Sequence, residues 1–353
     1  MERNTKEIFA ARLRKARKMS GLSMAGLSDA LGGLVSRQAI NKYENAQMLP
    51  SSEVIIEIGR VLGVKFDYFF MDSDVTISGL AFRSDIKVSQ KERSRIIARI
   101  QEVLERYYEA EVIADESHDF ITTFYEMVIE DDEDARVAAM RLHADWSLED
   151  KPLYPLFDIM ENNGVKVISC DFLPAGVKGV YCNVCGNPVI ALNDNLESEE
   201  SRFTAVHELG HGLLKFKEGI SDGIKEKLCD AFACYVLLPR DVLAEQLGRK
   251  REWIHLEEIK MIQARYGLPA DKIVYEARQG KIISSYSYRR FMQEMESNVG
   301  YLELVNESVM SEQKPSRMRQ LVLKAYGEAE ISESKASVLL NASTIEVHQM
   351  PLV

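Results

Sequence analysis

Two histidines four residues apart, His207 and His211, constrain this chain more than any other feature of its sequence. In an α-helix this spacing places both imidazole rings on one face, one turn apart. Two nitrogens placed in this way can bind one zinc ion, with Glu208 beside the open coordination position as a general base. The motif therefore predicts a zinc-binding helix within residues 203–214. Taken alone, it also fits an ordinary amphipathic helix that carries two surface histidines.

A second predicted helix begins near Glu226, ends at Pro239 and offers further groups for the same metal. Glu226 and Asp230 are four residues apart and therefore share one face of this helix. Because a neighbouring carboxylate is a common third ligand of a catalytic zinc, we expect Glu226 to complete the site. We expect Asp230 to accept the second ring N–H of a ligating histidine and so set its tautomer. Without the histidines, both residues would be interpreted as ordinary surface acids.

Length and composition indicate a multidomain cytoplasmic protein. The 353 residues are long for one hydrophobic core, and 46% hydrophobic with 28% charged residues is typical of a folded chain. No apolar run approaches the roughly 20 residues that span a bilayer, and the first residues lack the apolar core of a secretion signal. Five cysteines fit a reducing compartment better than a disulfide framework. We therefore expect no membrane partner.

Charge is unevenly distributed along the chain. Residues 1–70 hold eleven Lys and Arg against seven Asp and Glu, a net charge of +4. Because the whole chain carries −11, the remainder carries −15. A basic first segment on an acidic body predicts two domains with different partners, and double-stranded DNA is the expected partner of the first.

The basic segment is predicted to form short helices. Hydrophobic spacing places them over residues 6–19, 24–31, 37–44 and about 50–62. In the first helix, basic side chains that include Arg12 and Lys15 are expected to be available to phosphate. The third carries the side chains that can bond base edges or phosphates, namely Arg37, Gln38, Asn41 and Lys42. A helical module that binds only protein is the alternative.

This segment resembles the Cro/CI-type (XRE) helix-turn-helix family along almost its whole length. The matching residues are Gly21-Leu22-Ser23, Leu27, Leu31-Gly32, Ser36-Arg37-Gln38, Ile40, Tyr43-Glu44-Asn45, Pro50 and Leu62-Gly63-Val64. The resemblance implies a DNA-contacting recognition helix that starts at Ser36, and dimers that bind two half-sites. Departures are a longer turn at 32–35, Met24 in place of a phosphate-bonding residue, and Ala46 where glycine is common.

Residues 135–245 resemble the ImmA/IrrE-type metallopeptidase family. Several ordered motifs carry the resemblance: Arg202 to His211, Glu226-x-x-x-Asp230-x-Phe232-Ala233, Leu237-Leu238-Pro239, and upstream Leu173-Pro174, Gly176-Val177 and Ile190-x-Leu192-Asn193. The resemblance implies that His207, His211 and Glu226 bind Zn²⁺ and that Glu208 is the general base. Cys229 departs from the pattern, since alanine is usual there. An XRE domain before a peptidase domain is also a family arrangement.

The expected fold is α+β and mainly α. Its expected parts are an all-α helix-turn-helix domain (1–71), a helical connector (72–134), a zincin-like peptidase domain (135–245) and a helical C-terminal region (246–353). In the connector we expect a linker at 72–88 and then a long helix from Gln90 to about Ala114. Strands at 165–168, 179–182 and 188–193 predict a small antiparallel sheet, in which Val189–Leu192 is the expected edge for an extended peptide.

Together these features predict a DNA-binding transcriptional regulator fused to a zinc endopeptidase. By resemblance, such a peptidase cleaves a repressor or another regulatory protein in a mobile-element, stress or toxin–antitoxin circuit. The alternative is a non-proteolytic autorepressor or antitoxin whose zincin-like domain binds a partner or senses a signal. We expect a homodimer. No oxyanion-stabilising residue follows from the sequence, and Tyr181 and Tyr235 are only candidates.

Overall fold

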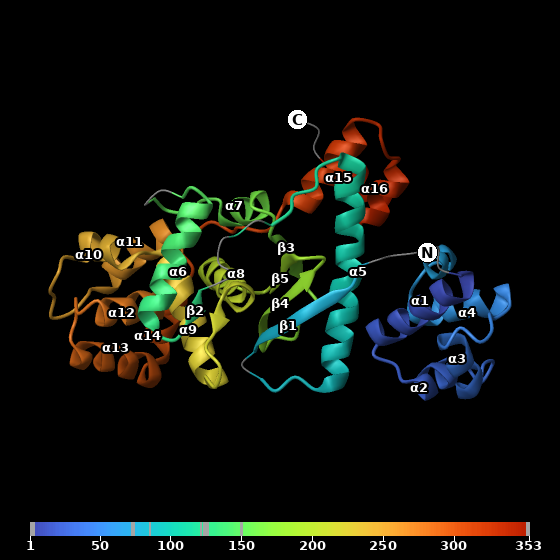
Figure 1. Cartoon of the computed structure of the whole chain (residues 1–353), viewed down its shortest axis with the longest axis horizontal. Helices are drawn as coiled ribbons and strands as arrows, with labels where there is room; N and C mark the ends of the chain where they lie inside the picture. Colours follow the sequence, from blue (N-terminus) through green and yellow to red (C-terminus); the bar gives the residue numbers. More distant parts are fainter. Residues whose placement is uncertain are drawn as a thin grey trace. The chain divides into compact units, whose positions relative to one another are not determined.

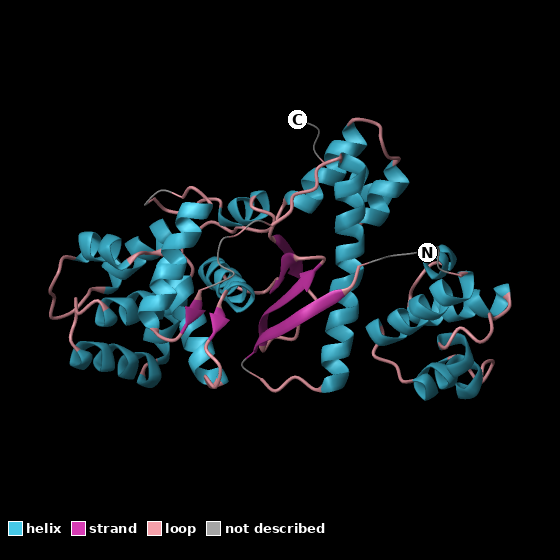
Figure 2. Ribbon diagram, in the orientation of Figure 1, coloured by secondary structure: helices cyan, strands magenta, loops and turns pink. Residues whose placement is uncertain are grey.

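The computed structural model describes residues 4–71, 75–84, 86–120, 122, 127–148 and 151–350. Helices predominate in this part of the chain (Figures 1 and 2). Two compact units are present: the first holds residues 1–77 and 87–109, and the second holds residues 78–86 and 110–353. The segment expected as a connector is thus shared between the two units.

The first unit contains the predicted helix-turn-helix segment. Its elements are α1 (Thr5–Met19), α2 (Met24–Ala30), α3 (Arg37–Glu44), α4 (Ser52–Leu62) and the 3-10 helix η1 (Phe66–Phe70). Asn4, Ser23 and Ser36 each start a helix by accepting a hydrogen bond from a backbone N–H of its first turn. Phe9 and Ile40 belong to the shared core and are fully buried. The predicted pattern of four helices is confirmed.

Two of the departures from the family pattern have visible backbone consequences. Gly32 and Gly33 in the longer turn have φ of 62° and 78°, in the left-handed region that glycine adopts without a Cβ clash. Ala46, where glycine is common, also has a positive φ, of 56°. For a residue with a Cβ this conformation costs about 1–2 kcal/mol, so the alanine carries local strain.

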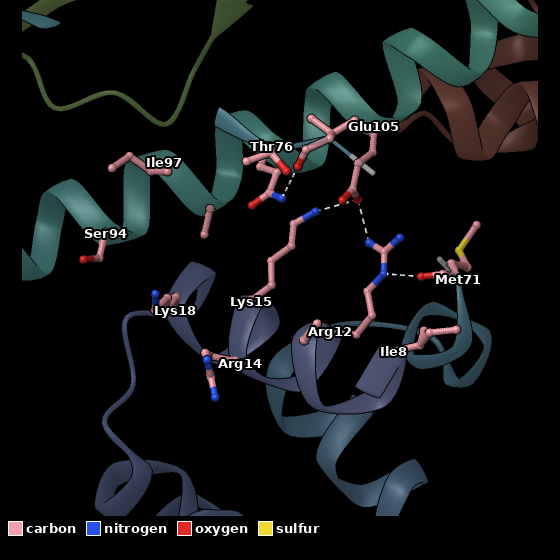
Figure 3. A pocket seen from close by; sticks show the side chains of 14 residues that line it. Ile8, Arg12, Arg14, Lys15, Lys18, Met71, Thr76, Ser94, Ile97 and Glu105 are labelled. Carbon is pink, nitrogen blue, oxygen red and sulfur yellow. Dashed lines mark hydrogen bonds and ion pairs between the residues drawn. The ribbon is translucent and has the colours of Figure 1, made fainter. Parts of the chain in front are cut away.

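Acidic residues of α5 (Gln90–Ala114) neutralise the inner face of α1 in the first unit. Glu105 forms ion pairs with Arg12 at 2.5 Å and with Lys15 at 2.6 Å. These side chains line a cavity of about 360 Å³ between the two helices (Figure 3). Arg12 and Lys15 are therefore buried and paired, and the expectation that they are available to phosphate is wrong.

The second unit is built on a four-stranded sheet. Its strands are β1 (Ile77–Ser84), β3 (Lys166–Cys170), β4 (Val177–Val184) and β5 (Asn187–Asn193), in the order β1-β4-β5-β3. The strands predicted at 179–182 and 188–193 are confirmed, and β4 and β5 pair antiparallel. However, β3 pairs with β5 in parallel, so the sheet is mixed rather than antiparallel. The chain reverses direction between β3 and β4 and again between β4 and β5, so β3 and β5 run in the same direction.

Strand β1 lies within residues 72–88, where the sequence suggested a linker with some extended character. Ser78 Oγ donates to Asn183 O and Ser84 Oγ donates to Gly176 O, so β1 and β4 run in opposite directions. In the described sheet, β1 and β3 form the edges, whereas β5 is paired on both sides and fully buried. The expectation that Val189–Leu192 is an edge for a peptide is therefore wrong.

Helices cover the sheet and pack on one another. The first helices of this unit are α6 (Asp132–Asp145), α7 (Leu156–Asn162), α8 (Ser198–Leu213) and α9 (Asp222–Leu237). Helix α8 packs on β4 and β5, α9 packs on α8, and α6 packs on α9 (Figure 1). Asp131 and Asp134 form a capping box that starts α6. The short strands β2 (Val128–Ile129) and β6 (Lys215–Phe216) pair in parallel.

The C-terminal region is helical, as predicted. Its helices are α10 (Arg240–Leu247), α11 (Leu256–Tyr266), α12 (Ala270–Gln279), α13 (Ser285–Ser297), α14 (Val299–Asn306), α15 (Arg317–Gly327), α16 (Glu333–Leu340) and α17 (Thr344–His348). Ser284 is the N-cap of α13 and accepts a hydrogen bond from Ser287 N. Within the described residues, none of the helices is both long and apolar enough to cross a membrane.

A buried ion pair joins the end of α5 to β3 within the second unit. Lys166 Nζ lies 2.5 Å from Glu111 Oε1, and both side chains are 1% exposed. Lys166 Nζ also donates to the carbonyl oxygen of His118. In such surroundings either charge is strongly unfavourable without the other.

We expect Lys166→Met to destabilise the second unit, because the change leaves the Glu111 carboxylate buried without its cation. Breaking such a pair typically costs about 3–5 kcal/mol. Adding Glu111→Leu removes the remaining charge and should recover most of the loss. Urea unfolding followed by tryptophan fluorescence measures both variants, since Trp146 and Trp253 lie in the second unit. Equal stability of the wild-type protein and Lys166→Met would contradict this account.

Candidate metal centre and recognition helix

Helix α8 carries both histidines and is closely packed against its neighbours. A Cβ at Gly212 would lie 2.3 Å from ring atoms of Tyr181 on β4, and one at Gly210 would lie 3.1 Å from Phe232 on α9. Because glycine lacks this atom, the sheet and α9 can both approach α8 closely. This packing fixes the direction in which the histidine face of α8 points.

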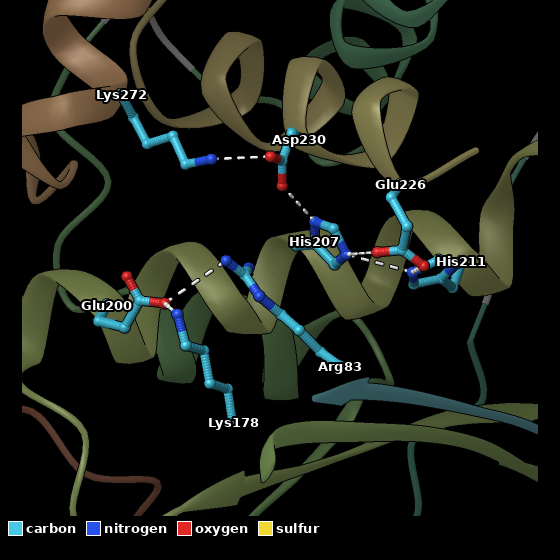
Figure 4. Close-up of polar contacts among 8 residues, drawn as sticks. All are labelled: Arg83, Lys178, Glu200, His207, His211, Glu226, Asp230 and Lys272. Carbon is cyan, nitrogen blue, oxygen red and sulfur yellow. Dashed lines mark hydrogen bonds and ion pairs between the residues drawn. The ribbon is translucent and has the colours of Figure 1, made fainter. Parts of the chain in front are cut away.

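Three side chains from α8 and α9 converge beside this face (Figure 4). His207 Nε2 lies 3.1 Å from His211 Nε2 and 3.1 Å from Glu226 Oε2. His211 Nε2 lies 3.3 Å from Glu226 Oε1, and the close contacts with the two histidine rings hold the pKa of Glu226 at about 2. One ligand atom from each residue lies within 4.8 Å of the others. Two imidazole nitrogens and a carboxylate oxygen could hold a metal ion, and this donor set suits zinc.

The second ring nitrogen of His207 is held by Asp230. His207 Nδ1 lies 2.8 Å from Asp230 Oδ1, and Lys272 on α12 donates to Asp230 Oδ2 at 2.7 Å. Burial would raise the pKa of Asp230, but the hydrogen bond from His207 and the charge of Lys272 hold it below its usual range. A charged Asp230 keeps the proton on Nδ1 and leaves Nε2 for a ligand. Sequence reasoning missed Lys272, because nothing marks a lysine 42 positions after its partner.

Glu208 is completely buried, and neither carboxylate oxygen accepts a hydrogen bond from the described residues. Strand β4 lies directly against it, since a Cβ at Gly179 would be 3.1 Å from Glu208 Cγ. Burial raises the pKa of this carboxyl group. A buried acid without a hydrogen-bond donor is costly and is typical of functional sites, and a raised pKa suits an acid that must accept and return a proton.

A second polar cluster lies further along α8 toward its N-terminus (Figure 4). Glu200 Oε1 lies 3.0 Å from Lys178 Nζ and 3.4 Å from Arg83 Nη2. Arg83 belongs to β1, so a segment expected as a linker reaches the site. Sequence reasoning missed this residue. The available signal was the run of β-branched and apolar residues over Val75–Phe82, which is typical of a strand.

The two tyrosines considered for oxyanion stabilisation have other contacts. Tyr235 donates from its hydroxyl to Asp132 Oδ2 at 2.6 Å, which directs the hydroxyl toward α6. The Tyr181 ring packs against Gly212 on α8. The Tyr235 hydroxyl therefore bonds to α6, and the ring of Tyr181 supports helix α8.

In the first unit, α3 presents polar side chains to solvent. The predicted contact residues are all exposed: Ser36, Arg37, Gln38, Asn41 and Lys42. Ser36 Oγ also caps the helix by accepting a hydrogen bond from Ala39 N. The C-terminal end of α3 is anchored by buried Glu44, whose carboxylate accepts hydrogen bonds of 2.5 and 2.8 Å from Arg17. The anchored helix leaves its exposed side chains accessible to a partner.

Comparisons with known families agree with both units. Residues 13–69 match a helix-turn-helix family, and residues 160–277 match the IrrE N-terminal-like domain, a peptidase family. Neither the curated proteins nor the solved structures contain a match to the chain. Lys272 lies within the second matched segment, whereas β1 and Arg83 lie outside both. The chain therefore carries an XRE-type helix-turn-helix domain followed by an IrrE N-terminal-like domain of a peptidase family.

Proposed function

We propose that the protein is a DNA-binding transcriptional regulator whose second unit is a zinc-dependent endopeptidase that cleaves a regulatory protein. The observation that carries this proposal is the convergence of His207, His211 and Glu226 beside the buried, unpartnered carboxylate of Glu208. The helix-turn-helix domain supports DNA binding. A regulator of a mobile-element, stress or toxin–antitoxin circuit would be the natural substrate of a peptidase joined to such a domain.

In this proposal His207, His211 and Glu226 hold the zinc ion, and Asp230 fixes the tautomer of His207. Zinc held by such a donor set polarises a peptide carbonyl and makes water more acidic. Glu208 takes a proton from the attacking water as its oxygen bonds to the carbonyl carbon and the π pair moves to the carbonyl oxygen. When the C–N bond breaks, Glu208 returns that proton to the leaving nitrogen.

Strand β1 is the edge to which we assign the extended peptide. It lies at one side of the described sheet and carries Arg83, whose side chain reaches α8. Backbone pairing along an edge strand holds a peptide in an extended form whose carbonyl groups are accessible. Strand β5 cannot serve in this way, because β3 and β4 occupy both of its sides.

We expect the protein to bind zinc stoichiometrically, and Asp230→Asn to weaken the binding about 10–100-fold by releasing the orientation of His207. A competition titration against a chelator of known zinc affinity measures the change. Asp222→Asn is the matched control, since its side chain lies on the same helix and is 94% exposed. Absence of zinc from the wild-type protein, or equal affinities for all three proteins, would contradict the proposed metal site.

Replacing Glu208 by Gln should leave zinc content unchanged and remove proteolysis. Glutamine has nearly the same shape but cannot accept the proton, a loss worth about 10²–10⁴-fold in rate. Mass spectrometry of protein N-termini in the native host compares wild-type protein with Glu208→Gln and with the control Glu218→Gln at an exposed position. New N-termini that persist in Glu208→Gln would rule out this base, and full regulatory activity of that variant would favour the non-proteolytic alternative.

Changing Arg37 and Gln38 together to Ala should weaken binding to the DNA upstream of the gene. Each lost base contact typically costs about 1–3 kcal/mol, so affinity should fall at least roughly tenfold. Gel shifts at fixed salt measure the effect, with Arg60→Ala on α4 as a control for loss of one exposed positive charge. Unchanged affinity of the double variant would argue against α3 as the recognition helix.

A further inference from the structure

Arg83 lies beside the candidate metal ligands but is not one of them. Its guanidinium carbon lies 4.7 Å from the ring centroid of Phe203 on α8. Phe203 precedes His207 by about one helical turn, and their ring centroids are 6.1 Å apart. The guanidinium therefore lies on the same side of α8 as His207, about one turn nearer the N-terminus of the helix (Figure 4).

The hydrogen bonding of Arg83 within the described residues is incomplete. Nη2 lies 3.4 Å from Glu200 Oε1, which is long for a hydrogen bond. Nη1 is buried and finds no acceptor among the described residues. An unpaired buried donor is costly, and in folded proteins such groups commonly serve a ligand or hold water. The side chain as a whole keeps 13% of its surface exposed to solvent.

Glu208 is the chemical complement of this unpaired donor. Its two buried carboxylate oxygens have no hydrogen-bond donor among the described residues. Burial raises the pKa of Glu208, and the positive charges of His207, His211 and Arg83 oppose this rise. A peptide and its attacking water would supply an acceptor for Arg83 and a donor for Glu208 at the same time.

We propose that Arg83 Nη1 donates a hydrogen bond to the carbonyl oxygen of the peptide bond being cleaved and stabilises the negative charge that develops there. This assignment rests on the proposed peptidase function and adds a catalytic residue to it. The π pair of the carbonyl moves to its oxygen while Arg83 keeps its proton, so no bond to Arg83 forms or breaks. Glu200 and the Phe203 ring hold the charge in place before a substrate binds, which avoids reorganisation during the reaction.

The other cations near the site are less suited to this role. Lys272 Nζ donates to Asp230 at 2.7 Å and lies on the side of His207 that faces away from the ligand atoms. Lys178 Nζ lies 3.0 Å from Glu200 Oε1, whereas Arg83 Nη2 lies 3.4 Å from the same oxygen. Lys178 therefore already has a close anionic partner. Arg83 alone among these three has a buried nitrogen without an acceptor in the described part of the chain.

Inorganic phosphate provides a test that requires no substrate, because it presents a tetrahedral oxyanion. Calorimetry would measure its binding to the zinc-loaded and the metal-free full chain, with zinc content checked in each sample. Arg83→Met should lower the phosphate affinity of the zinc-loaded protein about tenfold or more, the usual cost of a lost hydrogen bond to a charged group. Lys178→Met, which removes the other cation on Glu200, should leave the affinity within about twofold of wild type.

The outcomes separate this inference from the proposed function. Zinc-loaded wild-type protein that binds no phosphate, or Arg83→Met that binds it as wild type does, overturns the role of Arg83 and leaves the metal site standing. An equal loss of phosphate affinity in Lys178→Met also overturns it. The loss would then reflect the removal of any nearby positive charge and not the hydrogen bond from Arg83. If Arg83→Met fails to fold, Arg83→Lys takes its place, and wild-type affinity in that variant overturns the proposal. Absence of zinc from the wild-type protein would instead remove the proposed peptidase function itself.

Discussion

The hydrogen bond between His207 and Asp230 is the interaction on which the organisation of the second unit's site depends. It joins α8 to α9 and leaves Nε2 of His207 on the side where His211 and Glu226 meet it. Lys272 extends the chain of contacts to α12 by binding the other oxygen of Asp230. One polar connection thus orients the His207 ring and joins three helices.

The C-terminal region supports the same helix from its other end. Arg202 of α8 is buried and donates to the carbonyl of Leu153 at 2.7 Å and to Gln313 at 3.0 Å. Burial lowers the pKa of Arg202 to about 10, which still leaves it charged near neutral pH. Glu199 accepts hydrogen bonds from Ser308 and from Val309 N. Residues beyond 246 therefore contact the first turns of α8 and help to hold this helix in place.

Local signals predicted most of the elements, and long-range pairing accounts for the misses. Caps such as Ser36 and Ser89 act within one turn, so helix starts could be predicted from neighbouring residues. Strand β1 becomes an edge strand only because β4, a hundred residues later, offers it a partner. The parallel pairing of β3 with β5 is equally remote, and hydrophobic alternation carries no information on strand order.

The sequence by itself determined which residues could bind a metal or read DNA, because spacings of four in His207-His211 and Glu226-Asp230 define faces of single helices. The burial of α8 and its exact neighbours were decided only by the tertiary structure. Packing made Glu208 a buried acid without a partner and brought Arg83 and Lys272 to the site from distant segments. Such contacts depend on how separate elements pack, and no local pattern of residues encodes them.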